Sequence, residues 1–166
     1  EVSYRSTHPI TRFALKVLDD DGEPPPRTTR DGPSVEMFRF SDHGACVAFL
    51  AEELKQLIGQ EPLANVALLT PNSDLSRTYA QGLAHAEVSD VRQVIDQKFA
   101  CAPGIDVVEA SQVKGLEFDY VIIIEASARH YPDTPHHRRL LHVASTRAVH
   151  QLWLTCVATP SSILPT

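Results

Sequence analysis

Short apolar segments that alternate with amphipathic ones constrain the fold of this 166-residue chain more than any other feature. Residues 65–70 (NVALLT), 105–110, 119–125 and 151–157 are apolar runs of strand length, and residues 35–40 alternate like a half-buried strand. Apolar strands separated by helical patterns are typical of βαβ units, in which helices cover both faces of a parallel sheet. We therefore predict a three-layer α/β domain with a mostly parallel sheet.

The segments between these runs have the apolar spacing and the capping residues of helices. We predict helices over residues 7–18, from Ser41 or Asp42 to about Gly59, over residues 73–85 and over residues 137–148. Residues 91–99 are ambiguous, and we interpret them as a short strand or turn followed by a helix.

Three further segments are expected to lack regular structure. Residues 19–34 are expected to form a flexible loop, because the part that reads DDDGEPPPRTTR (residues 19–30) is rich in proline and charge. We also expect an irregular loop over residues 127–135 and a frayed end over residues 159–166.

Composition excludes several classes of protein. The longest apolar runs are far shorter than the ~20 residues that a membrane-spanning helix needs. The net charge of −6 argues against a domain that grips nucleic acid alone, because phosphate neutralisation dominates that affinity. The three cysteines, Cys46, Cys101 and Cys156, have neither zinc-ligand spacing nor a disulfide pattern, and we expect buried thiols in a reducing compartment.

The sequence also lacks the common motifs of self-contained enzymes. It has no GxxxxGK[ST] and no GxGxxG after a strand, so it carries no phosphate cradle of its own. Neither a GxSxG elbow nor an HExxH motif is present. Free-standing nucleotide hydrolysis is therefore not expected, and an unrelated Rossmann-type enzyme is disfavoured.

Three polar clusters remain: SYRST at residues 3–7, KGLEFD at 114–119 and RRLLHVASTRA at 138–148. In this order and spacing they resemble motifs IV, V and VI of superfamily 1 helicases of the UvrD/Rep/PcrA type, and the last two clusters are the most specific part. The resemblance covers nearly the whole chain. It implies that residues 1–166 form a single second RecA-like domain, with motif IV near 3–7, motif V near 109–119 and motif VI near 138–148. The first RecA-like domain, with its Walker A loop, is absent from the chain.

The resemblance implies a set of ATP-facing residues. Tyr4 would stack on the adenine, Arg5 and Arg147 would be catalytic arginines at the γ-phosphate, Glu117 would bind the ribose, and Gly115 would permit a close backbone approach. Arginine suits this role, because its planar guanidinium matches phosphate oxygens and a finger arginine can contribute roughly 10³ to 10⁵ in rate.

The same resemblance implies contacts to a single strand from Ser111, Gln112 and Lys114. The family usually has threonine and histidine where this chain has Glu109 and Ser111. A carboxylate is repelled by phosphates, so Glu109 weakens this half of the resemblance, whereas neutral donors and one lysine remain suited to a phosphate backbone.

Each assignment has a structural alternative. Arg5 would be a solvated surface residue, Tyr4 a half-buried aromatic side chain, Arg147 a cation at a helix C-terminus, and Glu117 a local partner of Lys114. A metal site among His130, His136, His137 and His142 is disfavoured, since carboxylate or cysteine companions at ligand spacing are missing, and no metal site is predicted.

We expect the C-terminal motor domain of an ATP-dependent DNA helicase or translocase, with a role in DNA repair. Its partners would be single-stranded nucleic acid, DNA in preference to RNA, and the N-terminal RecA-like domain of the same protein. ATP and Mg²⁺ would be bound only by the full-length enzyme, and the isolated fragment would be inactive, monomeric, cytoplasmic and nucleoid-associated. The alternative is a degenerate helicase-like module that serves only for protein or nucleic-acid binding.

Overall fold

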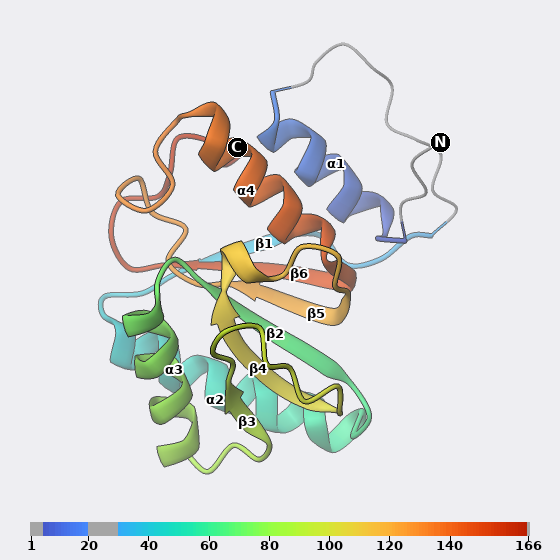
Figure 1. Cartoon of the computed structure of the whole chain (residues 1–166), viewed down its shortest axis with the longest axis vertical. Coiled ribbons are helices and arrows are strands. Elements are labelled where there is room, and N and C mark those ends of the chain that lie inside the picture. Colours follow the sequence, from blue (N-terminus) through green and yellow to red (C-terminus); the bar gives the residue numbers. More distant parts are fainter. Residues whose placement is uncertain (1–4, 20–29, 166) are drawn as a thin grey trace.

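A computed structural model describes residues 5–19 and 30–165, which form three layers around one sheet (Figure 1). The strands lie in the order β1-β6-β5-β2-β4-β3, and every pairing between them is parallel. Their bounds are β1 Glu36–Arg39, β2 Asn65–Thr70, β3 Val91–Gln93, β4 Gly104–Glu109, β5 Phe118–Ile123 and β6 Ala148–Cys156. The predicted parallel sheet is confirmed.

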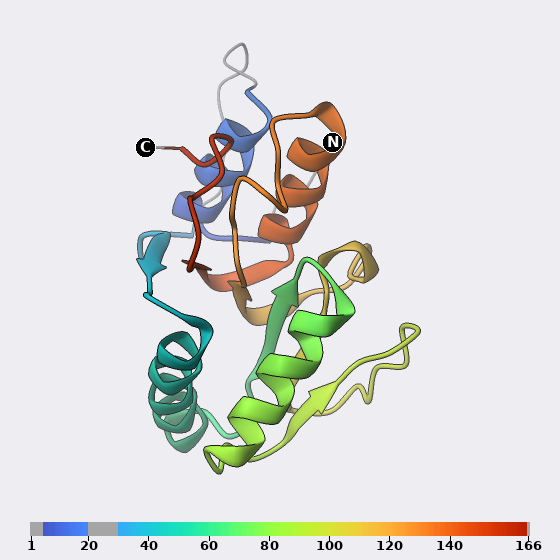
Figure 2. The same cartoon turned by 90° about the vertical axis from the view of Figure 1, so that its left-hand side faces the viewer.

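Helices cover both faces of the sheet (Figures 1 and 2). On one face α1 (His8–Val17) packs against α4 (Pro135–Thr146), and on the other α2 (His43–Gln60) packs against α3 (Ser73–His85). Successive strand residues point to opposite faces, so Ile122 enters the core under α2 and α3, and Ile123 enters the core under α1 and α4. This is why β5 is apolar at consecutive positions rather than at alternate ones.

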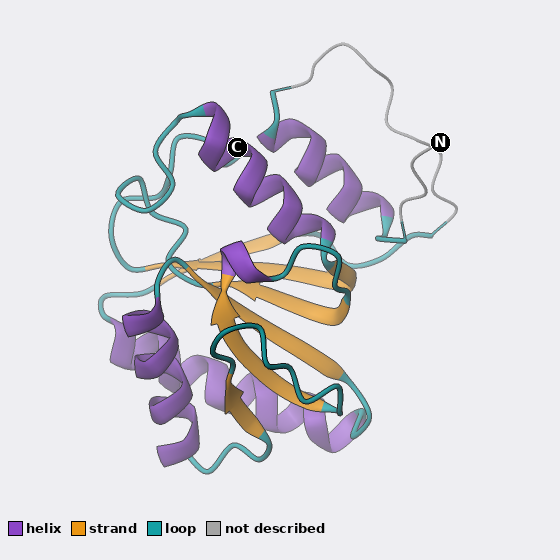
Figure 3. Cartoon of the chain, in the orientation of Figure 1, coloured by secondary structure: helices purple, strands orange, loops and turns teal. Residues whose placement is uncertain are grey.

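The connection between β4 and β5 is unusually short. β4 ends at the carboxyl edge of the sheet and β5 begins at the amino edge, so residues 110–117 cross back over the face that carries α1 and α4 (Figure 3). Such crossovers usually take about a dozen residues or more and contain a helix. Here one 3₁₀ turn, η1 (Ala110–Gln112), and the fully buried Val113 hold the segment on the sheet.

Several expected elements are confirmed. The bounds of β2 and α3 agree with the prediction, and Asp42 rather than Ser41 caps α2, because its Oδ1 accepts a hydrogen bond from the Ala45 amide at 2.7 Å. α4 starts two residues earlier than expected, where Pro135 occupies the first turn behind the Thr134 cap.

Two expectations are wrong. No helix follows β3: residues 94–103 are irregular, and Asp96, Gln97 and Cys101 adopt positive φ, which a continuous helix does not allow. The predicted frayed end is also wrong for the part that the structure describes. Ser161 and Ile163 are buried, and the Ser161 hydroxyl donates to the Tyr131 carbonyl.

The expected loop over residues 19–34 lies only partly within the described residues, because positions 20–29 are outside them. Residues 30–34 are irregular as expected, yet they contact the start of the chain. No helix in the described ranges has the length and hydropathy needed to cross a membrane.

The three thiols do not share one environment. Cys46 and Cys156 are buried as expected, but Cys101 is exposed, which corrects the prediction of three buried thiols. Burial raises the pKa of Cys46, and burial together with the Glu125 carboxylate raises the pKa of Cys156 to about 12.

We therefore expect a thiol-alkylating reagent at neutral pH to modify only Cys101 in the folded chain. The buried pair stays protonated and covered, and thiolate is the reactive form. Mass spectrometry should show one adduct under native conditions and three in denaturant, and the Cys101→Ser variant should show none when folded. Rapid native labelling of Cys46 or Cys156 would contradict this arrangement.

Candidate functional site

Three of the predicted ATP-facing residues meet at the amino edge of the sheet. Glu117 immediately precedes β5, Arg147 immediately precedes β6, and the Phe118 amide donates to the Arg147 carbonyl at 2.9 Å. Arg5 reaches the same place from the start of the chain, with its Nη1 3.4 Å from Glu117 Oε2. Residues that are far apart in sequence thus form one polar cluster, which we call the arginine cluster (Arg5, Glu117 and Arg147).

The location of this cluster differs from the general expectation for α/β sheets. Ligands usually bind outside the carboxyl ends of strands. Here Glu117 and Arg147 stand before their strands, because the short crossover delivers the KGLEF turn to the opposite edge. Any residue that directly precedes a strand of a parallel sheet lies at the amino edge, and this holds for Glu117 after the short crossover and for Arg147 after α4 alike.

Arg147 is held in a fixed position. It is the C-cap of α4, and its guanidinium donates to the carbonyls of Val143 and Leu116 at 3.1 and 3.2 Å and to the Thr146 hydroxyl at 3.2 Å. The structural alternative, a cation at a helix C-terminus, is therefore realised in its contacts. Because those contacts also reach the KGLEF turn, they orient the guanidinium toward the arginine cluster.

Arg5 is exposed at its tip and anchored at its backbone. Its side chain is 74% exposed and that of Glu117 is 45% exposed, so their ion pair is weak and can open for a ligand. The backbone, in contrast, is fixed: the Arg30 guanidinium donates to the Arg5 carbonyl at 2.9 Å, and the Ser6 hydroxyl donates to the Ala148 carbonyl at 2.6 Å.

A close approach of two backbone segments completes this anchor. A Cβ atom added to Gly32 would lie 2.7 Å from the Thr7 Cγ2 atom, and Thr7 is buried. The His8 amide also donates to the Arg30 carbonyl at 2.9 Å. Arg30 and Gly32 are positioning residues for Arg5 that the sequence analysis missed, since a proline-rich loop gave no signal for them.

The turn before β5 has the geometry expected of its glycine. Gly115 has a φ of +82°, and an added Cβ would meet no atom within 4 Å, so only the backbone conformation requires glycine. Glu117 pairs with Arg5, and the structural alternative, a local pair with Lys114, is not found among the ion pairs of the described residues. Tyr4 lies outside the described residues.

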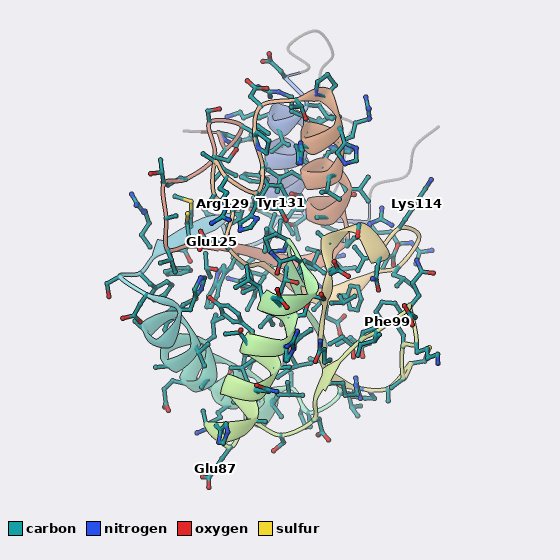
Figure 4. The ribbon with its side chains drawn as sticks, turned by 60° about the vertical axis from the view of Figure 1, so that its left-hand side comes forward. Glu87, Phe99, Lys114, Glu125, Arg129 and Tyr131 are labelled. Carbon is teal, nitrogen blue, oxygen red and sulfur yellow. The ribbon has the colours of Figure 1, made fainter. Side chains whose placement is uncertain are left out.

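The residues predicted to contact a single strand begin at the carboxyl edge. Ser111 is exposed in η1, and Lys114 is exposed and extends into solvent (Figure 4). Gln112 is committed elsewhere: its amide nitrogen donates to Glu109 Oε2 at 2.9 Å, and its oxygen accepts from the Gln97 amide at 3.4 Å. The Glu109 carboxylate, which would repel phosphates, is thus partly satisfied by Gln112.

A buried carboxylate that the sequence analysis did not single out lies at the other end of β5. Glu125 follows the strand with a φ of +53° and is 4% exposed. Its Oε1 accepts from the Val157 and Ala158 amides at 3.2 and 3.3 Å, and its Oε2 lies 3.5 Å from His43 Nε2. It joins the end of β5 to the end of β6 and the start of α2.

The histidines of the motif VI region have structural contacts. His142 Nδ1 donates to the Ala14 carbonyl at 2.8 Å, so this residue links α4 to α1. His137 contacts the Thr134 cap. Within residues 5–19 and 30–165 no group of three histidine, cysteine, aspartate or glutamate residues is arranged to hold a metal ion.

Comparisons with known proteins agree with this geometry. The sequence profile of the UvrD-like helicase C-terminal domain matches residues 104–155, which include the crossover, β5, α4 and most of β6. Residues 104–155 thus carry the sequence signature of a UvrD-like helicase C-terminal domain. A comparison with curated protein sequences gives no match.

Solved structures extend the likeness to nearly the whole chain. The C-terminal domain of a possible DNA helicase from Lactobacillus plantarum has 27% identity and a TM-score of 0.77, with 98% of this chain and 92% of that one covered. A DEAD box protein from Methanococcus jannaschii has 13% identity and a TM-score of 0.54, with 93% and 44% covered. The UvsW helicase of bacteriophage T4 has 8% identity and a TM-score of 0.52, with 73% and 46% covered. These two likenesses show the fold alone, and the chain spans less than half of either protein. The predicted RecA-like α/β fold is confirmed.

The close approach between Gly32 and Thr7 leads to a prediction about stability. Gly32→Ala should lower the free energy of unfolding by about 1–3 kcal/mol, because the new methyl group collides with the buried, β-branched Thr7. Thermal unfolding followed by circular dichroism measures the change. The matched control is Gly59→Ala within α2, where no atom lies within 4 Å and the variant should gain up to about 1 kcal/mol. Equal stability of Gly32→Ala and the parent chain would refute the close approach.

Proposed function

We propose that this UvrD-like domain supplies catalytic arginines to an ATP site whose phosphate loop lies on a separate N-terminal RecA-like domain. The observation that carries the proposal is the convergence of Arg5, Glu117 and Arg147 at one edge of a domain without a phosphate cradle. Two guanidinium groups beside a carboxylate suit a triphosphate and a ribose, and a domain with only half of such a site needs a partner to complete it.

The chemistry assigned to each residue follows from its contacts. Arg147 is held by carbonyl groups on two sides, so little reorganisation would be needed when charge develops on a transferring phosphoryl group. Arg5 is exposed at its tip and paired with Glu117. Bound ATP would draw Arg5 to the γ-phosphate and leave the Glu117 carboxylate for a ribose hydroxyl. ATP and Mg²⁺ would be held mainly by the N-terminal domain, and Gly115 would let the turn approach the nucleotide.

Strand binding forms the other half of the proposal. Ser111 and Lys114 would contact the backbone of single-stranded nucleic acid, DNA in preference to RNA, from the start of the same crossover that ends at Glu117. Gln112 would join them by exchanging its hydrogen bond to Glu109 for one to a phosphate. Because hydrolysis would require the two domains to close, cycles of closure would move the protein along the strand. The full-length protein would thus be an ATP-dependent DNA helicase or translocase.

One observation favours a second candidate function. The Arg147 guanidinium already bonds three groups of its own domain, as a purely structural residue would. A helicase-like module that only binds protein or nucleic acid would keep these contacts after losing the motor. It would have no use for the exposed Arg5.

The arginine assignment is tested in the protein that contains both domains. Arg147→Ala should lower the rate of strand-stimulated ATP hydrolysis by about 10³-fold or more while sparing much of the nucleotide affinity, because the phosphate loop still binds ATP. Arg138→Ala is the matched control, since Arg138 lies on the same helix and pairs with Asp133. The purified 166-residue chain should not hydrolyse ATP. Normal hydrolysis by Arg147→Ala, or turnover by the isolated chain, would refute the proposal.

The proposed contact of Lys114 with single-stranded nucleic acid predicts a different effect for Lys114→Ala. Loss of one exposed phosphate contact should raise the strand concentration needed for half-maximal stimulation of ATP hydrolysis, with little change in the maximal rate. Lys16→Ala on α1 removes the same charge far from the crossover and should leave both values unchanged. Equal effects of the two substitutions would show that general charge, and not a contact, is involved.

A further inference from the structure

We propose that the turn Ser127–Tyr131, which carries Arg129 and His130, binds a backbone phosphate of the single strand and extends the strand path beyond the KGLEF crossover. This inference rests on the proposed function and adds a site that the three helicase-like clusters do not contain. Its basis is a basic patch at the carboxyl edge, on a turn that the rest of the domain fixes in place.

The turn is built rigidly although its tip is exposed. The amides of Ala126 and Ala128 donate to the carbonyls of Thr155 and Thr159, at 2.9 Å in both cases. The Tyr131 amide donates to the Ser127 carbonyl at 2.8 Å, and both residues are buried. Between these fixed points, Arg129 is exposed and, among the described residues, makes no hydrogen bond or ion pair. Its side chain is available for a ligand while its backbone is held.

Basic groups gather around this turn. Arg39 ends β1, His43 begins α2, and together with Arg129 and His130 they form what we call the basic rim. Burial lowers the pKa of His130; Glu125 opposes the shift, and the nearby Arg129 and His43 reinforce it. His130 is thus a neutral donor at neutral pH, and an anion beside it would favour the charged form.

The acidic groups of the region are already occupied. Glu125 is buried and accepts from the Val157 and Ala158 amides. Asp42 caps the Ala45 amide, and Asp133 forms two hydrogen bonds to Arg138 at 2.7 and 3.0 Å. The positive charge of the rim at neutral pH comes from Arg39 and Arg129; Arg39 donates to the Ala158 carbonyl at 3.3 Å, so Arg129 is the rim guanidinium that has no partner among the described residues. Phosphate is the anion that matches an unpaired guanidinium best.

The sheet places the basic rim on the same edge as the residues predicted to contact single-stranded nucleic acid. Along the carboxyl edge β4 leads to Ser111, β2 leads to the N-terminus of α3, and β5 leads to Arg129. Two strand spacings, roughly 10 Å, separate β4 from β5 at this edge. Figure 4 shows Arg129 near Glu125 and Tyr131, above the N-terminal end of α3. A strand crossing this edge would pass from Ser111 over the start of α3 to Arg129. The exposed Asp74 in the first turn of α3 is paired with Arg77 at 2.7 Å, and Asn72 caps the Leu75 amide.

The connections of the sheet diverge at the same point. β2 continues into α3 on one face, and β5 continues into α4 on the other, so their carboxyl ends flank a topological switch point. Such a point is where open α/β sheets bind ligands. The arginine cluster lies at the opposite edge and does not use it. The switch point is thus free to bind the single-stranded nucleic acid.

The test is a titration of the isotope-labelled 166-residue chain with a short oligothymidylate at low salt, followed residue by residue by NMR. We expect shifts at Arg129 and His130 as well as at Ser111 and Lys114. Arg129→Ala should weaken binding about tenfold and reduce the slope of log affinity against log salt by about 0.7, the value for one phosphate contact on a single strand. Arg129→Lys should recover part of the affinity, since it keeps the charge but not the guanidinium fork.

Arg12→Ala is the matched control, because Arg12 is an exposed arginine on α1 that contacts only His8 among the described residues. It should bind the strand as the parent chain does. Shifts confined to residues 111–114, with unchanged affinity of Arg129→Ala, would overturn this inference and leave the proposed function intact. The absence of shifts anywhere would overturn the proposed strand path itself. Equal shifts with inorganic phosphate at the same phosphate concentration would show a site for single anions and not for a strand.

Discussion

The burial of β5 between β2 and β6 is the constraint on which the rest of the domain depends. Ile122 and Ile123 enter opposite cores, so the strand cannot slip by one residue without exposing both faces. Its amino end is tied to Arg147 through the Phe118 amide, and Glu125 ties its carboxyl end to the loop after β6. Both candidate sites therefore stand on the ends of one immobile strand.

Local patterns were sufficient for most of the fold. The bounds of the strand NVALLT and of the helix after it were predicted correctly. A continuous apolar run followed by helical spacing of apolar residues marks both elements in the local sequence. The predicted helix after β3 is wrong because the apolar residues of this segment, among them Phe99, pack as a loop onto the crossover and Phe118. The predicted frayed C-terminal end is wrong for a related reason, since the distant turn at Tyr131 holds Ser161 and Ile163 in place. Periodicity carries no information about contacts of this kind.

The candidate sites show the same difference between residues that a local motif reveals and residues that act through long-range contacts. Short motifs singled out Arg5, Glu117 and Arg147, and these residues come together in the fold. Their contact with a nucleotide stays a prediction. The residues that hold such a site leave no motif, because Arg30 and Gly32 act through one hydrogen bond and one close approach to the start of the chain. Arg129 escaped notice because one arginine in an irregular loop is uninformative until the loop is known to be rigid.

The length of the crossover suggests how the two edges would communicate. Ser111, at the proposed strand path, is separated from Glu117, at the proposed ATP site, by one buried anchor, Val113, and one flexible glycine, Gly115. The Leu116 carbonyl accepts directly from Arg147, so a displacement of the turn would alter the support of that guanidinium. A longer crossover helix would absorb such a displacement within its own hydrogen bonds. A short segment fixed at Val113 would transmit it, which is a physical reason for the proposed motor to keep this connection short.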